Sequence, residues 1–172
     1  APAGTPTMHV GTFVRGQGRF FVTEYVPTTE RTSSVYPLLL TTGRVLMQYN
    51  VGAQTRRTDN VAWQHEDLLE MHPHDAEARG IADGDWVGVS SRIGQTVLRA
   101  VVTEKVPMGV VYTTFHFPES GANLVTTENS DWATNCPEYK VTAVEAVRVD
   151  RPDEWRRRHG AHDAPAAAGD RV

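Results

Sequence analysis

The stretch WVGVSSRIGQTVLRAVVT, residues 86–103, contains the pattern that decides the fold. An apolar run at 86–91 is followed by a tight connection at 92–94 and a longer run at 96–103. In an extended chain alternate residues share a face, so one face of the longer run holds Leu98, Ala100 and Val102 and the other holds Val97, Arg99, Val101 and Thr103. We therefore predict two consecutive strands joined by a short turn.

Further short apolar runs lie on both sides of this stretch, at 36–42, 68–71, 110–114 and 141–149. Residues 72–80 differ, because they have Pro near the start, acids in the first turn and Gly at the end, which predicts a helix of about two turns. About six short strands with one or two short helices between them predict a sandwich or a barrel. The fold class is therefore mainly β with short helices.

The 172 residues are enough for one domain with tails. Residues 1–34 are rich in Gly, Thr and Arg and are predicted to be a connecting arm, with one extended apolar stretch at 20–25. Residues 35–150 hold the strands, and the charged, Ala/Pro-rich tail at 151–172 is predicted to be disordered apart from a helical turn near Trp155. The chain opens without Met, which suggests a cut inside a longer protein; a processed N-terminus is the alternative.

The composition excludes several classes of function. Hydrophobic residues make up 40% and charged residues 22%, which is typical of a globular protein. The net charge of -4 disfavours nucleic acid as a partner, although the basic clusters at 56–57 and 156–158 could each bind a phosphate. No apolar run could span a bilayer, so we expect no membrane partner. The single cysteine, Cys136, excludes an intrachain disulfide and fits a cytoplasmic location.

Three polar segments could carry chemistry. The first, at 40–44, places Thr hydroxyls, a Gly and an Arg at a strand end, where they suit a phosphate or a carbonyl-rich heterocycle. The second, at 48–57, combines side-chain amides with an aromatic ring and two arginines. The alternatives are an ordinary strand-to-turn junction for the first and a solvated polar loop for the second.

The third segment is 115–123, which continues through 136–140 and mixes aromatic rings with a His, an Asn and a Lys. His116 could bind a ligand or be a hydrogen-bonded core histidine, and the sequence leaves both open.

His72 and His74 flank a proline, which fits a helix start better than a metal pair. Cys136 has no neighbouring triad pattern, so we expect a loop or core thiol. The chain contains no P-loop, and the pattern around Gly16 and Gly18 is a poor match to a Rossmann motif.

Several long motifs occur together and in order. They are YPLLLTTGR at 36–44, QYNVGAQTRRT at 48–58, EMHPHDAE at 70–77, GIADGD at 80–85, ANLVTT at 122–127 and SDWATNCPEYKVTAV at 130–144. They closely resemble the C-terminal domain of formate dehydrogenase catalytic subunits, within the molybdopterin oxidoreductase (DMSO reductase) family. The last motif is most similar to the soluble NAD-dependent type. The resemblance implies a six-stranded double-psi β-barrel of the aspartate-decarboxylase-like type.

The resemblance also implies a ligand, molybdopterin guanine dinucleotide, two copies of which chelate molybdenum or tungsten while this domain closes over them from one side. It implies a first contact loop of Thr42, Gly43, Arg44 and Val45, and a second of Gln48, Tyr49 and Asn50. It implies a further group of Phe115, His116, Asn123, Tyr139 and Lys140, and adds Thr55, Arg56 and Arg57.

In that family the metal ligand, the catalytic His and Arg and the cysteines of the iron–sulfur clusters lie upstream of this region. We therefore expect no catalytic and no metal-ligating residue in this chain, and no activity from the chain alone. The partners implied are the rest of the catalytic subunit and NAD-reducing electron-transfer subunits. Two alternatives stay open: the same domain of a related oxidoreductase such as nitrate reductase, and a stand-alone, non-catalytic binding module.

Overall fold

The two strands predicted within residues 86–103 form the hairpin of β3 (Trp86–Ser90) and β4 (Gln95–Val102) in the computed structural model, which describes residues 3–4 and 6–158. Leu98 and Ala100, which the alternation placed on one face of β4, are both buried in the core. Ser91 closes the turn, because its hydroxyl accepts hydrogen bonds from the N–H groups of Ile93 and Gly94. This tight turn places β3 and β4 side by side.

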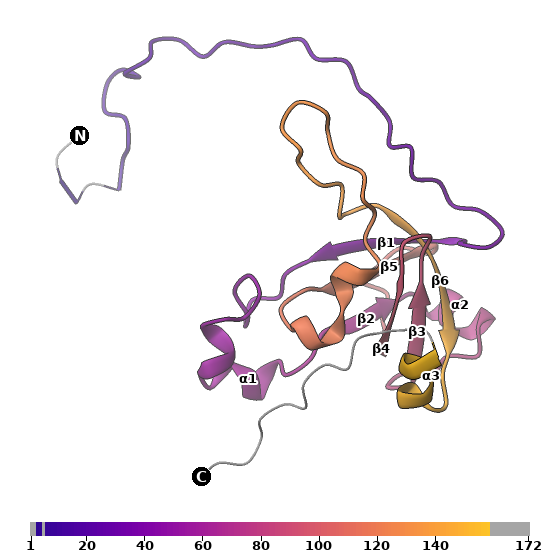
Figure 1. Cartoon of the computed structure of the whole chain (residues 1–172). Helices are drawn as coiled ribbons and strands as arrows, with labels where there is room; N and C mark the ends of the chain where they lie inside the picture. Colours follow the sequence, from indigo (N-terminus) through magenta and orange to yellow (C-terminus); the bar gives the residue numbers. More distant parts are fainter. Residues whose placement is uncertain (1–2, 5, 159–172) are drawn as a thin grey trace.

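Four further strands complete a closed barrel (Figure 1). They are β1 (Leu38–Gly43), β2 (Leu68–Met71), β5 (Val110–Thr114) and β6 (Thr142–Arg148). The order around the barrel is β1-β5-β2-β4-β3-β6, in which β1–β5 and β2–β4 are parallel pairs and the other pairs are antiparallel. The prediction of a mainly β, six-stranded barrel with few short helices is confirmed.

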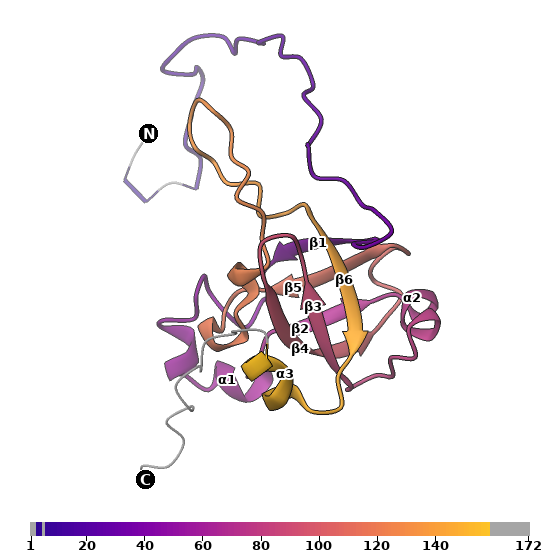
Figure 2. The same cartoon turned by 45° about the vertical axis from the view of Figure 1, so that its right-hand side comes forward.

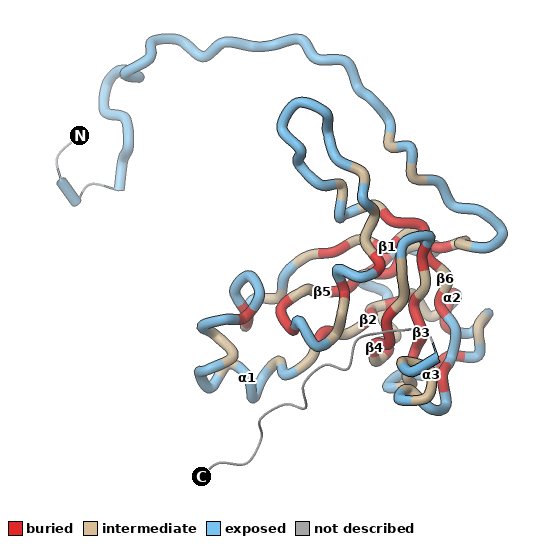
Figure 3. The backbone as a smooth tube through the Cα atoms, in the orientation of Figure 1, coloured by how far each residue is buried: buried red, intermediate tan, exposed pale blue. Residues whose placement is uncertain are grey.

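The barrel interior is an apolar core to which all six strands contribute (Figure 3). Leu38 and Leu40 of β1, Leu69 of β2 and Val111 of β5 are at most 2% exposed. Burying one such side chain stabilises the fold by roughly 1.5–3 kcal/mol. Closure of the sheet leaves no open edge strand, so the core is sealed on every side by paired backbone.

Helix α2 (Pro73–Ala78) begins where the sequence predicted a helix start. His72 is the N-cap residue, and its Nδ1 accepts a hydrogen bond from the N–H of His74 at 3.1 Å. Helix α3 (Pro152–Arg158) packs outside the barrel, with the Trp155 ring against Gly88. A Cβ at position 88 would lie 2.8 Å from the Trp155 ring, so that strand position needs Gly.

Some predictions of irregular structure were too simple. The polar stretch 44–65 contains a 3-10 turn, η1 (Thr55–Arg57), and a short helix, α1 (Asn60–Trp63). The stretch 115–140 contains two more 3-10 turns, η2 (Pro118–Ser120) and η3 (Ala122–Leu124). The turn expected near Trp155 is the longer helix α3, and the disorder expected beyond it falls on residues 159–172, outside the described part.

The segment before β1 leaves the barrel as an extended, exposed chain (Figures 1 and 2). Its attachment point is Glu30, whose carboxylate accepts hydrogen bonds from the N–H of Ala143 at 2.8 Å and from Arg92 at 2.6 Å. The side chain of Glu30 is only 11% exposed, so these bonds hold the chain firmly where it joins the barrel. None of the helices within the described residues has the length and apolar character needed to cross a bilayer.

We predict that Leu69→Ala lowers the free energy of unfolding by about 2–5 kcal/mol, because it leaves a cavity in a core position that is 0% exposed. The matched control is Leu46→Ala, since Leu46 is 98% exposed, and it should change stability by less than about 0.5 kcal/mol. Urea unfolding followed by circular dichroism measures both. Equal losses in the two variants would contradict the assigned core.

Candidate functional site

The parallel pairing of β1 and β5 brings two polar loops to one edge of the barrel. Gly43, the last residue of β1, is opposite Thr114, the last residue of β5. Parallel strands end at the same edge, so the chain segments that follow them, 44–52 and 115–120, leave the barrel next to each other. Residues from the first and third of the predicted polar segments therefore meet.

His116 joins these two loops. Its Nε2 accepts a hydrogen bond from the N–H of Val45 at 3.1 Å, and its Nδ1 is hydrogen-bonded to the backbone oxygen of Asn50. Because Nε2 accepts, the ring is neutral with its proton on Nδ1, which donates to Asn50. The side chain is 0% exposed. Of the two possibilities that the sequence left open, the structure therefore has the hydrogen-bonded core histidine.

Arg44 lies on the outer side of this contact. Its guanidinium donates to Oδ1 of Asn50 at 3.0 Å and lies 5.4 Å from the centre of the Phe115 ring. Asn50 has a positive φ of 47°, a conformation that Asn adopts more readily than other non-Gly residues. Both Arg44 and Asn50 are exposed, so the pair faces solvent at the loop surface.

Lys140 reaches the same strand end from the far side of the sequence. Its Nζ donates to the backbone oxygen of Thr42 at 2.7 Å and lies 5.5 Å from the centre of the Tyr139 ring. The hydroxyl of Thr42 in turn donates to the backbone oxygen of Tyr139 at 2.8 Å. These two bonds join residues almost 100 positions apart in the chain, and they bring the exposed Lys140 to the end of β1.

Gln48 and Thr55 shape the second loop from inside. Gln48 is 4% exposed, and its amide donates to the backbone oxygen of Gln64 at 2.9 Å. The hydroxyl of Thr55 donates to Oε1 of Gln48 at 2.6 Å and accepts from the N–H of Tyr49 at 3.1 Å. The Gln48 amide, which was predicted to contact a ligand, therefore forms hydrogen bonds within the loop. The Tyr49 ring, in contrast, is 63% exposed.

Arg56 and Arg57 differ in their surroundings. Arg56 forms an ion pair with Glu119 and lies 5.0 Å from the centre of the Phe117 ring. Burial would raise the pKa of Glu119, but hydrogen bonds from its own backbone N–H and from Arg56 outweigh burial and lower the pKa below its ordinary value. Arg57 is exposed, and its side chain forms no hydrogen bond, ion pair or ring contact with the other described residues. Asn123 is likewise exposed, in η3.

The sequence analysis missed Asp67, which organises the loop after β5. Its buried carboxylate accepts four hydrogen bonds, from the N–H groups of His116 and Phe117, both at 3.0 Å, and from the hydroxyls of Thr114 and Ser120. Four donors compensate the cost of burying the charge. The sequence gives no local sign of this role, because Asp67 is a single acid before a short strand. All four of its donors lie 47 or more residues away along the chain.

Tyr112 was missed as well. Its hydroxyl donates to the backbone oxygen of Arg44 at 3.0 Å, and its ring covers Gly43, where a Cβ would lie 2.5 Å from the hydroxyl oxygen. Burial raises the pKa of Tyr112, with smaller contributions from the negative charges of Glu70 and Asp67. The phenol therefore stays protonated and remains a donor to the Arg44 loop.

The loop that carries Tyr139 and Lys140 is held by Asp131. Its carboxylate accepts from the hydroxyl of Thr134 and from the N–H groups of Thr134, Cys136 and Ala133, at 2.8–2.9 Å for the three N–H groups. In the same order of importance these donors lower the pKa of Asp131 to about 2. Ser130 and Pro137 form a β-bridge at the neck of the loop, with the exposed Cys136 next to it.

Three of the predicted site cations form no ion pair with the other described residues. Within the described residues, Arg44, Arg57 and Lys140 have no carboxylate partner, as is also true of exposed cations elsewhere such as Arg31 and Lys105. Arg79, Arg92, Arg99 and Arg148 each form an ion pair. Exposed cations with adjacent amides and backbone donors form a set that suits a ligand with phosphate groups and a heterocycle with donor and acceptor edges. The residues present therefore fit a dinucleotide.

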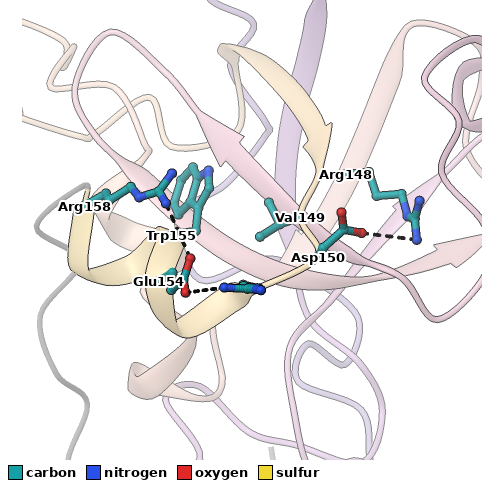
Figure 4. A pocket seen from close by; sticks show the side chains of 7 residues that line it. Arg148, Val149, Asp150, Glu154, Trp155 and Arg158 are labelled. Atoms are coloured by element: carbon teal, nitrogen blue, oxygen red, sulfur yellow. Dashed lines mark hydrogen bonds and ion pairs between the residues drawn. The ribbon is translucent and has the colours of Figure 1, made fainter.

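A hollow of about 300 Å³ lies between the end of β6 and α3 (Figure 4). Trp155 forms one wall, and none of the predicted cofactor residues lines it. Arg151 and Arg158 both pair with Glu154, and Arg148 pairs with Asp150. Its cations are thus neutralised internally, and we place the candidate site at the ends of β1 and β5 instead.

Residues 38–143 match the family model of the Molydopterin dinucleotide binding domain. The chain is 38% identical over 149 residues to the F420-dependent formate dehydrogenase 1 subunit alpha of Methanococcus maripaludis, covering 85% of this chain and 22% of that protein. It is 33% identical over 122 residues to the assimilatory nitrate reductase catalytic subunit of Bacillus subtilis, covering 70% and 17%. The chain thus spans less than a quarter of the length of these curated relatives.

The fold also matches part of a solved structure. Acetylene hydratase from Pelobacter acetylenicus superposes with a TM-score of 0.59 at 19% identity, covering 66% of this chain and 18% of that one. This likeness agrees with the double-psi β-barrel expected from the sequence. The resemblance to formate dehydrogenase catalytic subunits is supported, but the NAD-dependent type is not, because the formate dehydrogenase relatives found are F420-dependent.

We predict that Asp67→Asn lowers the free energy of unfolding by about 1–3 kcal/mol, because the amide NH₂ of Asn would face donors that now bind a carboxylate oxygen. The matched control is Glu66→Gln, which removes the part-exposed ion pair with Arg99 and the contact with the exposed His65, and should cost less than about 1 kcal/mol. Chemical unfolding of both variants gives the comparison. A Glu66→Gln loss as large as that of Asp67→Asn would contradict the assigned role.

A second prediction concerns pH. The folded-state pKa of Asp131 is about 2, below the roughly 3.9 of an unfolded aspartate. The carboxylate therefore stabilises the loop above about pH 4, and this stabilisation is lost as the pH falls towards the folded pKa. Amide proton shifts of Thr134 and Cys136 should titrate with a midpoint well below 3.9 and should not titrate in Asp131→Asn. A midpoint close to that of an ordinary aspartate would refute the hydrogen-bonded loop.

Proposed function

Because the chain belongs to the family of the Molydopterin dinucleotide binding domain, we propose that the loops after β1 and β5 bind a molybdopterin guanine dinucleotide. The observation that carries the proposal is the meeting of the loops after β1 and β5, where Arg44 and Lys140 are exposed and form no ion pair with the other described residues. A dinucleotide brings phosphate charge to these side chains and amide-like edges to the neighbouring side chains.

We divide the predicted site residues into two groups by their contacts. The first group faces solvent and is proposed to contact the cofactor directly: Arg44, Tyr49, Asn50, Arg57, Asn123, Tyr139 and Lys140. The second group is already hydrogen-bonded or packed inside the barrel and is proposed to position the first: Thr42, Gly43, Val45, Gln48, Thr55, Arg56, Phe115 and His116. Asp67 and Tyr112 join the second group because they hold the same loops.

The direct contacts supply charge and orientation. Arg44 is held in place by its hydrogen bond to Asn50 and by the Phe115 ring, so little side-chain freedom is lost when it meets a phosphate. Lys140 contributes a point charge beside the end of β1. When bound, the metal of the cofactor supplies the redox chemistry, and this chain supplies binding and orientation.

For the whole protein we propose a formate dehydrogenase, in which formate yields carbon dioxide, a proton and two electrons, with the clusters and metal ligand in the part of the subunit upstream of this chain. The relatives favour F420 over NAD as the acceptor, which changes the expectation drawn from the sequence. The same domain of a nitrate reductase is the second candidate, favoured by the Bacillus subtilis relative at lower identity and coverage.

We predict that Arg44→Ala and Lys140→Ala, made in the whole catalytic subunit, each weaken cofactor binding by roughly 10- to 150-fold, the equivalent of about 1.5–3 kcal/mol for a charged hydrogen bond. The measurement is molybdenum or tungsten and extracted pterin per subunit after dialysis. The matched control is Lys105→Ala, because Lys105 is an exposed lysine in the connection between β4 and β5. Full cofactor content in both site variants would refute the proposal.

A further inference from the structure

Both nitrogens of the His116 ring bind backbone groups of another loop. Nε2 accepts from the N–H of Val45 at 3.1 Å, and Nδ1 donates to the backbone oxygen of Asn50. Val45 and Asn50 are the two ends of the segment 45–50, which follows β1. One side chain therefore fastens both ends of a segment that carries two of the proposed cofactor contacts, Tyr49 and Asn50.

This fastening requires a neutral ring. An imidazole can accept a hydrogen bond only at a nitrogen that carries no proton, and Nε2 is that nitrogen here. A proton on Nε2 would set one donor against another, the N–H of Val45. The bond from Nδ1 to Asn50 could persist, but the protonated ring could no longer hold both ends of the segment at once.

The surroundings of the ring offer a positive charge little compensation. The charged and titratable side chains on the segments that pack around it are Arg44, Tyr49, Arg56, Asp67, Tyr112 and Glu119.

None of the carboxylates among these described residues forms an ion pair with the ring, which is 0% exposed. Asp67 binds the backbone N–H of His116 and already has four donors, and Glu119 pairs with Arg56. A buried imidazolium without a charged partner is costly. Uptake of a proton is therefore coupled to movement of the ring or of the segment that covers it.

The middle of the segment has anchors of its own. The amide of Gln48 donates to the backbone oxygen of Gln64 at 2.9 Å, and the N–H of Tyr49 donates to the hydroxyl of Thr55 at 3.1 Å. Neither bond involves His116. Loss of the histidine bonds therefore frees the ends of the segment, whereas its middle stays attached.

The freed ends are the part that places charge in the candidate site. Arg44 directly precedes Val45, and its guanidinium donates to Oδ1 of Asn50 at 3.0 Å. The same backbone positions that His116 fastens thus determine where this pair lies. If the cofactor binds only the assembled pair, its apparent affinity falls with the fraction of molecules in which the pair is assembled.

We propose that His116 is a proton-sensitive positioning residue, whose neutral ring closes the segment 45–50 for cofactor binding and whose protonation opens the segment and releases the cofactor. This proposal rests on the proposed function, because it assigns a regulation to the same site. Closure is present at neutral and alkaline pH and is lost on acidification, since histidine is the side chain that ordinarily changes charge between about pH 5 and 8.

The first test is an NMR titration of the 172-residue chain from about pH 8 to about pH 4.5. The ¹⁵N shifts of the His116 ring should show a proton on Nδ1 alone at the start, and the ring and the Val45 amide should then titrate with one midpoint. The Tyr49 amide is the internal control and should not follow that midpoint. A ring that gains a proton without a change at Val45, or that stays neutral throughout, would overturn the proposal.

The second test is cofactor retention in the whole catalytic subunit. During dialysis, pterin should be lost about tenfold faster at pH 5 than at pH 7.5, the ratio expected if about nine tenths of the molecules are open in acid. His116→Gln has an acceptor and donors that do not titrate, so it should lose this ratio whatever its cofactor content at neutral pH. His74→Gln changes a side chain that is 68% exposed in α2, and it should keep the ratio. The same ratio in His116→Gln as in the unchanged subunit would refute the assigned role.

The two tests together separate this proposal from the proposed function. If the ring and Val45 titrate together but the subunit holds no pterin at either pH, the proton-sensitive closure stands and the proposed function fails. If the subunit retains pterin equally well at both pH values, the proposed function stands and the regulation by His116 fails.

Discussion

The parallel pairing of β1 with β5 is the constraint on which the candidate site depends. Parallel neighbours end at one edge, so two loops from distant parts of the chain leave the barrel together at Gly43 and Thr114. A parallel connection needs a long crossover, and here the crossover contains β2, α2 and the β3–β4 hairpin. The site is thus a consequence of barrel topology, and every strand contributes indirectly to the meeting of its loops.

Two buried polar residues convert this proximity into a defined surface. Asp67 gathers donors from the loop after β5, and His116 of that loop holds the loop after β1 through Val45 and Asn50. Each polar group is satisfied, which is the condition under which a buried network orders a structure instead of destabilising it. The exposed residues Arg44 and Lys140 can then present charge from a rigid base.

The distribution of charge follows the same division. On the barrel wall arginines pair with acids, such as Arg99 of β4 with Glu66, and these pairs contribute little beyond local order. At the ends of β1 and β5, cations face solvent beside amides and aromatic rings. The family to which the chain belongs gives these exposed cations a proposed purpose, namely to bind the phosphates of a dinucleotide.

The strands, the helix start at His72 and the mainly β class were predictable from the sequence, because alternation, Pro and Gly act between near neighbours in the chain. The grouping of Arg44, Asn50, His116 and Lys140 was expected only through the family resemblance. Which of these residues face solvent, and which are buried, was decided by tertiary structure. His116 and Gln48 lie inside because their partners come from other loops. Asp67 gave no sequence signal for the same reason: a buried carboxylate is defined by distant donors, and only the closed barrel brings those donors to it.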